Sequence, residues 1–160
     1  DSSIVEISPA PLNKGEKQFI DDLRDFYTDN TAYFEGKELY LLRNLSKGRG
    51  VGFFEAGNFH PDFILWIAQG ETQHIAFIDP KGLRNIGPKD PKVEFYKTIK
   101  EIETRLGDSN VHLHSFIVSN TAFGSMLWDM TKAEMSDRNI CFQEEAHEIY
   151  IRFILDRIIG

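Results

Sequence analysis

The chain has 160 residues, a formal net charge of −7 and a single cysteine, Cys141. That length suits one domain around one core, and a lone cysteine excludes an internal disulfide and fits a reducing, cytoplasmic environment. No apolar run approaches the roughly 18 residues of a membrane helix and no signal peptide is present, which excludes a membrane protein. The negative net charge also argues against a chain that binds nucleic acid through its own surface, because Lys and Arg supply most of the affinity for nucleic acid.

Residues 1–13 show no clear period and contain two prolines, so we predict a linker or arm there and the domain proper at 14–160. The first residue is Asp1 rather than Met, which leads us to expect a fragment of a larger protein, with a processed or trimmed terminus as the alternative. From position 14 apolar residues recur at three- and four-residue steps and predict a helix. They are Phe19, Ile20, Leu23, Phe26 and Tyr27. Residues 38–45 read as a strand.

Two strongly apolar runs, 63–68 and 75–78, are separated by a short polar segment with a glycine. They predict an antiparallel hairpin that is apolar on both faces and therefore central in a sheet. A second helix is expected at 92–106 and another strand at 111–118. The buried stripe of that helix is predicted to comprise Val93, Tyr96, Ile99, Ile102 and Leu106. The remainder, 119–160, is predicted to be a helical extension with a short extended piece near 140–142.

This order of helix, three strands, helix and strand predicts an α/β fold with a central mixed sheet flanked by helices. The last helix carries apolar residues on most of its sides. They are Ile149, Tyr150, Ile151, Phe153, Ile154, Leu155, Ile158 and Ile159. A helix of this kind is normally buried on most sides. We therefore expect part of it to pack against something outside this chain, or against a second copy in a homodimer.

One segment combines charged residues with strand ends. Asp79 and Lys81 lie two apart, so they project from the same face of their strand. Asp62 opens the neighbouring antiparallel strand, which places it beside Asp79. Mg²⁺ binds oxygen ligands such as one or two carboxylates, and a nearby Lys can orient water or stabilise negative charge. The pattern predicts a centre for phosphodiester hydrolysis, although a structural ion-pair cluster is the alternative.

An acid separated by one residue from Lys occurs three times, as Glu35-Gly36-Lys37, Asp79-Pro80-Lys81 and Asp90-Pro91-Lys92. The first and third lie in stretches rich in Gly and Pro and read as surface loops. The middle one ends an apolar strand and follows the single Pro-Asp pair of the chain across a hairpin. Context therefore selects it. Its proline cannot donate to a sheet ladder, which is tolerable at a strand end.

Glu16 offers a third carboxylate. It precedes Phe19 and Ile20 by three and four positions, so it heads the buried stripe and should point toward the sheet. An active-site role is the expectation, and an acidic residue favoured by the helix N-terminus is the alternative.

With these motifs in place, the region 14–118 resembles the PD-(D/E)xK, restriction-endonuclease-like nuclease fold, with an αβββαβ core. The amino-acid sequence of residues 58–82 further resembles that of the C-terminal endonuclease domain of type III restriction and DEAD-DEAH helicase-fused proteins. The resemblance implies a Mg²⁺-dependent DNA endonuclease, with Mn²⁺ able to substitute, joined to a helicase or translocase that would hold the DNA. No phosphate-binding ATPase loop is present in this sequence.

By position, the resemblance implies that Asp62 and Asp79 are metal ligands and that the backbone carbonyl of Pro80 completes the metal shell. It further implies that Lys81 orients the attacking water and that Glu16 matches the helix acid some members use. A non-catalytic docking or DNA-positioning module with the nuclease fold is a second hypothesis. A nuclease acting on RNA or branched DNA is a third hypothesis, because the residues of the motif would contact the phosphate and not the base.

Basic and imidazole groups near the motif are candidates for substrate binding. Lys47 and Arg49 lie in the loop before the apolar runs, and Arg84, Lys89 and Lys92 lie in the loop after the motif. Both loops are expected at the catalytic end of the sheet. Phosphate contacts and solvated loop charges are equally good interpretations of them. His60 adjoins the Pro-Asp pair and could contact substrate.

Other reactive side chains receive structural interpretations. Glu55 is expected to be solvated in a loop, with a metal contact as the alternative. His112 and His114 share a strand face but lack a third nearby ligand, so we expect surface or core histidines. Cys141 has no paired base and is expected to be a small buried apolar residue.

Overall fold

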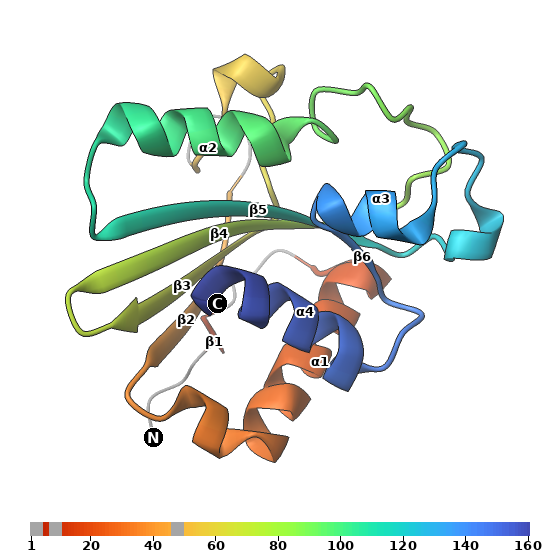
Figure 1. Ribbon diagram of the computed structural model, residues 1–160. Coiled ribbons are helices and arrows are strands. Elements are labelled where there is room, and N and C mark those ends of the chain that lie inside the picture. The colour runs from red at the N-terminus through yellow and green to blue at the C-terminus, as the bar shows by residue number, and fades with distance from the viewer. Residues whose placement is uncertain (1–4, 7–10, 46–49) are drawn as a thin grey trace.

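A computed structural model describes residues 5–6, 11–45 and 50–160 of the chain. It is an α/β structure in which helices flank both faces of a six-stranded mixed sheet (Figure 1). The expected fold class is thereby confirmed at the level of a mixed sheet between helical layers. Among the described residues, no helix is long and apolar enough to cross a membrane.

The elements follow the expected order, with additions at both ends. The helices are α1 (Lys14–Asp29), α2 (Phe95–Leu106), α3 (Lys132–Asp137) and α4 (His147–Ile159). Short 3-10 turns are η1 (Thr31–Phe34), η2 (Phe54–Ala56) and η3 (Phe123–Ser125). The strands are β1 (Val5–Glu6), β2 (Glu38–Arg43), β3 (Phe63–Gln69), β4 (Thr72–Lys81), β5 (Val111–Ser119) and β6 (Ile140–Phe142).

The strands lie in sequence order across the sheet, from β1 to β6. Strands β2, β3 and β4 form an antiparallel meander, whereas β4, β5 and β6 run parallel to one another. The predicted hairpin is confirmed as β3 and β4, which occupy the centre of the sheet. Strand β5 follows β4 through α2, the helical crossover that a parallel neighbour requires.

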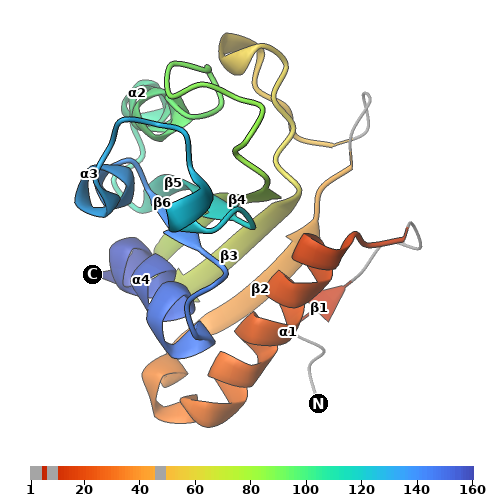
Figure 2. The same cartoon turned by 90° about the vertical axis from the view of Figure 1, so that its right-hand side faces the viewer.

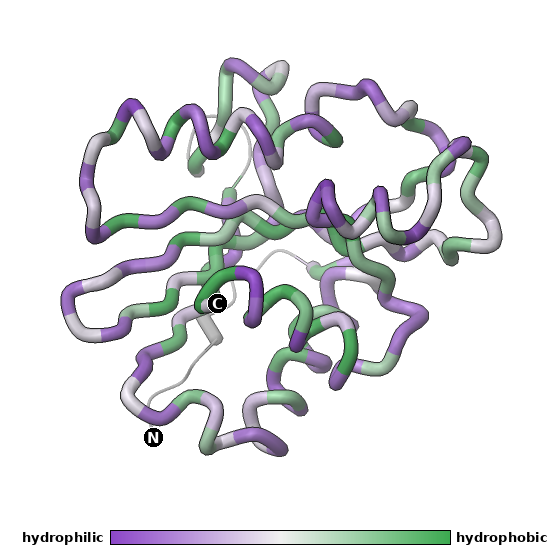
Figure 3. The backbone as a smooth tube through the Cα atoms, in the orientation of Figure 1, coloured by the Kyte–Doolittle hydropathy of each residue, from purple (hydrophilic) through white to green (hydrophobic). Residues whose placement is uncertain are grey.

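Helices α1 and α4 pack against one face of the sheet, and α2 and α3 cover the other (Figures 1 and 2). On the first face the α1 residues Phe19, Leu23 and Phe26 meet alternate residues of β2 and β3, such as Leu41 and Leu65. Figure 3 shows hydrophobic residues along the strands and along α4, while most of the loop before α2 is hydrophilic. Alternation of side chains along the strands supplies one core cluster under α1 and α4, and two clusters on the opposite face.

The start of α1 is set by a capping box. The Asn13 side chain accepts from the backbone N of Glu16 at 2.8 Å, and the Glu16 carboxylate accepts from the backbone N of Asn13 at 3.2 Å. These two bonds satisfy amides that no helical carbonyl can reach. The capping box fixes the helix N-terminus beside the end of the sheet at which β3 begins. The segment expected as a linker or arm also contributes strand β1, which pairs parallel to β2.

The second helix begins later than predicted. Residues 91–94 form a turn in which the Asp90 carbonyl accepts from the backbone amides of Val93 and Glu94. Phe95, which was missing from the predicted stripe, is fully buried, whereas Leu106 at the other end is 55% exposed. Leu106 is the last residue of α2, directly before the connection that leads to β5 (Figure 1).

The C-terminal extension is partly strand, because β6 joins the sheet beside β5. This arrangement lets α4 return across the sheet and lie against α1. Most of the apolar surface of α4 is therefore covered within the chain, including Tyr150, Ile151, Ile154 and Leu155. Ile149 is the apolar residue of α4 that stays largely exposed, at 56%, and the expected contact of part of this helix with an outside partner stays a prediction.

Candidate active site

The end of β4 presents a buried carboxylate and a lysine. The β3–β4 ladder ends at the pair Phe63–Ile78, whereas the β4–β5 ladder continues to Lys81. Asp79 and Lys81 therefore project from a stretch of β4 that has a strand neighbour on one side only. The Asp79 side chain is almost fully buried, and its Oδ2 lies 2.8 Å from Lys81 Nζ. The shared face predicted from their spacing is confirmed.

Asp62 lies directly before β3 and reaches Asp79 across the strand pair. Its backbone N donates to Asp79 Oδ1 at 3.3 Å, and the register of the hairpin, continued by one residue, sets the two opposite each other. The corner is tied to β2, because the backbone N of Asn44 donates to the Asp62 carbonyl at 2.8 Å. The hairpin thus brings together the two acids that are 17 residues apart in the sequence.

The Asp62 carboxyl keeps its proton near neutral pH. Burial raises the pKa of Asp62 to about 8, and the charge and hydrogen bond of Asp79 and the charge of Glu16 act in the same direction, while Lys81 lowers it. Removing a carboxylate from water and placing it beside another disfavours its charged form. At pH 7 Asp62 is therefore mostly protonated, and a cation that binds its carboxylate would displace that proton.

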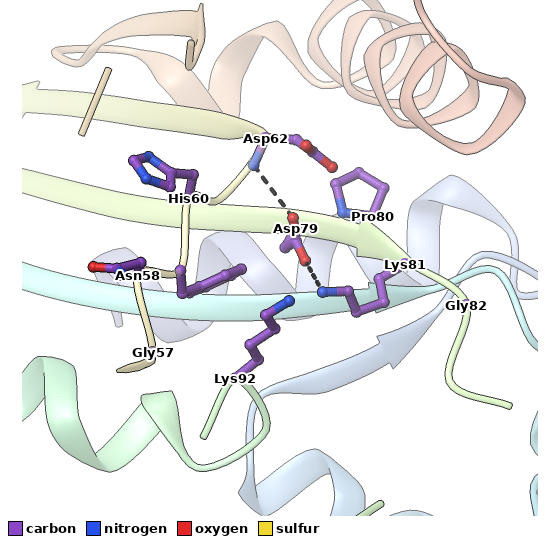
Figure 4. Close-up of a pocket in the computed structure, with 10 residues that line it drawn as sticks. Gly57, Asn58, His60, Asp62, Asp79, Pro80, Lys81, Gly82 and Lys92 are labelled. Atoms are coloured by element: carbon purple, nitrogen blue, oxygen red, sulfur yellow. Dashed lines mark hydrogen bonds and ion pairs between the residues drawn. The ribbon is translucent and has the colours of Figure 1, made fainter. Parts of the chain in front are cut away.

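These side chains open on a pocket of about 450 Å³ at the end of the sheet (Figure 4). Its walls come from the segment before β3, from the end of β4 and from the turn before α2. The lining residues are Gly57, Asn58, Phe59, His60, Asp62, Asp79, Pro80, Lys81, Gly82 and Lys92.

The donor set suits a hard divalent cation. Asp79 Oδ2 is buried, and although Lys81 Nζ is close, no donor meets it with hydrogen-bond geometry. The Lys81 ammonium offsets its charge, and a carboxylate oxygen has a second lone pair with which it can bind a metal ion. With Asp62 beside it, two oxygen ligands are available, and Mg²⁺ commonly takes one or two carboxylates and keeps several waters. Pro80 lines the same pocket, so its carbonyl belongs to the same neighbourhood.

Glu16 lies toward the sheet, as expected from its facing, but its carboxylate is already engaged. It forms an ion pair with Arg43 at 3.0 Å and accepts from both the backbone and side-chain nitrogens of Asn13. Glu16 is 7% exposed, and its charge acts on Asp62. It therefore both caps α1 and adds negative charge near the pocket.

The expected substrate-binding residues have different positions. His60 lines the pocket, but its ring is turned away from Asp79 and Lys81 in Figure 4. Arg84 is exposed in the loop after β4 and is not among the lining residues. Lys47 and Arg49 lie outside the described residues.

The remaining candidates lie away from the pocket. Glu55 is exposed and pairs with Arg105 at 2.8 Å, which agrees with its expected loop position. His112 and His114 have His74 of β4 as a neighbour, which stacks on His112 with ring centroids 5.1 Å apart and lies 5.9 Å from His114. These are ring contacts between strand side chains, and His114 is largely buried, in line with the expected surface or core histidines. Burial lowers the pKa of His114 to about 3, so this histidine is neutral at physiological pH.

One further group of potential metal ligands lies at the start of α4. Asp29, His147 and Glu148 bring one ligand atom each within 4.8 Å of one another. The Glu148 carboxylate is engaged by Asn30 at 2.8 Å and by Arg152 at 3.1 Å. All three side chains are at least partly exposed, so this group reads as an ion-pair network that joins α1 to α4.

Two residues that support the site were not predicted. The Asn44 amide donates to the carbonyls of Val51 and Pro61 at 2.7 and 2.8 Å, which fixes the loop before Asp62. Gly52 lies so close to the His60 ring that a Cβ there would meet a ring atom at 2.3 Å. Neither residue has a sequence neighbour in the site, so only the folded loop reveals these contacts.

Comparisons with models of known protein families and with curated protein sequences find no match for this chain.

Proposed function

We propose that this domain is a divalent-metal-dependent nuclease that hydrolyses DNA phosphodiester bonds. The observation that carries the proposal is the buried Asp79 carboxylate, which meets Asp62 on one side and Lys81 on the other at the floor of an open pocket. Two carboxylates and one ammonium are the groups that such hydrolysis needs. The finer fold assignment, a PD-(D/E)xK nuclease core, belongs to the same proposal.

Each residue has a distinct role. Asp62 and Asp79 hold Mg²⁺ or Mn²⁺ through carboxylate oxygens, and the Pro80 carbonyl is a further ligand. When bound, the ion lowers the pKa of a coordinated water and screens the charge that develops on the phosphate. The Lys81 ammonium, held beside Asp79, donates hydrogen bonds that orient the attacking water or a non-bridging phosphate oxygen. Glu16 contributes negative charge from the helix side.

The overall charge of −7 bears on how substrate is held. A surface this acidic repels DNA at long range, so affinity must come from the pocket itself or from another body. A helicase or translocase in the same polypeptide or complex would supply that grip. We therefore propose that the domain cuts DNA presented to it by such a partner.

A non-catalytic docking module is the second candidate, and a specific observation favours it. Lys81 already pairs with Asp79, and Arg43 already pairs with Glu16, so the charged groups partly neutralise one another without a metal. A purely structural cluster would look the same. The two candidates differ in whether a cation binds.

Calorimetric titration of Mn²⁺ and Mg²⁺ into the domain separates them. We expect binding that Asp79→Asn abolishes and that Glu35→Gln leaves unchanged. Glu35 is a matched control, because it heads the same acid-x-Lys spacing in an exposed turn. Absence of any binding in the wild-type chain would support the docking module.

Cleavage assays then test the chemistry. With Mn²⁺ or Mg²⁺ present, we expect Asp62→Asn, Asp79→Asn and Lys81→Met to lose nicking of plasmid DNA while melting cooperatively. Full activity in any one of the three would refute its assignment. The same assay with RNA and branched DNA identifies the preferred substrate.

A further inference from the structure

A second lysine enters the pocket from the turn before α2, 11 residues after Lys81. Lys92 lies in the turn before α2, and its backbone N donates to Asp90 Oδ1 at 2.8 Å. Its neighbour Val93 is buried in the core cluster that includes Met135 of α3. The turn is therefore anchored on both sides of Lys92, which holds its side chain over the pocket rather than in solvent.

The two lysines converge. Lys81 Nζ lies 5.4 Å and Lys92 Nζ 5.9 Å from the centroid of the same Phe59 ring, which is itself only 4% exposed. Figure 4 shows the amine ends of both side chains pointing toward each other beside Asp79. The ring attracts each ammonium through its negative face and so helps to keep both in place.

Two ammonium groups that point at each other repel unless an anion lies between them. Lys81 has the Asp79 carboxylate at 2.8 Å, whereas in the described part of the chain no carboxylate lies within 4.0 Å of Lys92 Nζ. Two ionised carboxylates would cancel the charge of one divalent ion, which leaves both ammonium groups uncompensated in the pocket. Such a cationic pocket suits a phosphate group.

We propose that Lys92 is a substrate-binding residue, whose ammonium contacts a non-bridging oxygen of the phosphodiester held between it and Lys81. The inference rests on the proposed nuclease function and extends it, because it assigns a phosphate contact to the turn before α2. It also explains how an acidic domain can be locally cationic where substrate enters.

The test is DNA binding with Ca²⁺ in place of Mg²⁺, measured by fluorescence anisotropy of a labelled duplex over a range of salt concentrations. We expect Lys92→Gln to weaken binding about tenfold, Lys92→Arg to retain most of it, and the salt slope to fall by about 1 in Lys92→Gln. Lys89→Gln is the matched control, since Lys89 is exposed three residues away and does not line the pocket.

The outcomes separate this inference from the proposed function. If Lys92→Gln binds DNA with the affinity and salt slope of Lys89→Gln, or if the wild-type chain has no measurable affinity for DNA, the assignment of Lys92 is overturned. Cleavage by the wild-type chain in the first case would leave the nuclease proposal standing. DNA binding that depends on Lys92 in a chain that never binds Mn²⁺ would support the phosphate contact and refute the nuclease.

Discussion

Asp62 should destabilise the metal-free fold, and removing its charge should stabilise it. The folded pKa of about 8 lies well above the value of about 4 expected for an unfolded chain. Between these two values the folded state keeps a proton that the unfolded chain has lost, so stability falls as pH rises from about 4 to about 8. The substitution Asp62→Asn replaces the protonated carboxyl with a neutral group of the same shape and removes this penalty.

The magnitude follows from the size of the pKa difference. At about 1.4 kcal/mol per tenfold change in proton affinity, the full penalty at pH 8 approaches about 5 kcal/mol. The Asp62 side chain is only partly buried, so water screens it, and we expect about 2 kcal/mol. For a domain of this size that corresponds to a rise in Tm of about 4–8 °C.

Thermal melts in EDTA at pH 5 and pH 8 test this reasoning. We expect Asp62→Asn to melt well above wild type at pH 8 and much closer to it at pH 5, with Glu35→Gln indistinguishable from wild type at both. Mn²⁺ should reduce the difference in Tm between Asp62→Asn and wild type at pH 8, because it binds and stabilises only the folded wild-type chain, whose metal site is intact. An equal gap at the two pH values would show that the Asp62 proton is not the source of the effect.

Three other predictions concern the rest of the chain. Because burial lowers the pKa of His114 to about 3 against an ordinary value of about 6.5, the fold loses stability as pH falls below that ordinary value. His114→Leu should therefore gain about 1–2 kcal/mol relative to wild type between pH 7 and pH 4.5 in urea denaturation, and parallel pH profiles would contradict this. Arg43→Met leaves Glu16 buried without its ion-pair partner and should lower the free energy of unfolding by about 3 kcal/mol. Adding Glu16→Gln to the same chain should recover most of this loss, and additive losses in the double variant would refute the coupling. Burial raises the pKa of the Cys141 thiol, so it should react with a thiol reagent only as fast as the chain unfolds, and rapid labelling of the native state would exclude that burial.

Local pattern was sufficient for most elements. The three- and four-residue steps of Phe19, Leu23 and Phe26 predicted α1, and the two apolar runs predicted the β3–β4 hairpin. Both predictions were possible because the spacing of buried residues in a helix or strand can be seen within a short stretch of sequence. Local pattern did not settle the start of α2, since Asp90 forms a turn that delays the helix. It also could not show that α4 is covered, because the covering surface comes from α1, more than a hundred residues earlier.

The candidate site divides in the same way. The Asp79–Lys81 pair and its neighbour Asp62 could be predicted from the sequence, because strand alternation and hairpin pairing are rules of local geometry. The sequence offered Lys92 only as one of several basic loop residues. Its convergence with Lys81 on Phe59, and the stacking of His74 on His112, came from the tertiary structure. Those contacts depend on where the turn before α2 and the β4–β5 crossover place side chains in space. No spacing along the chain encodes such distances, which arise when separate elements pack on a common sheet.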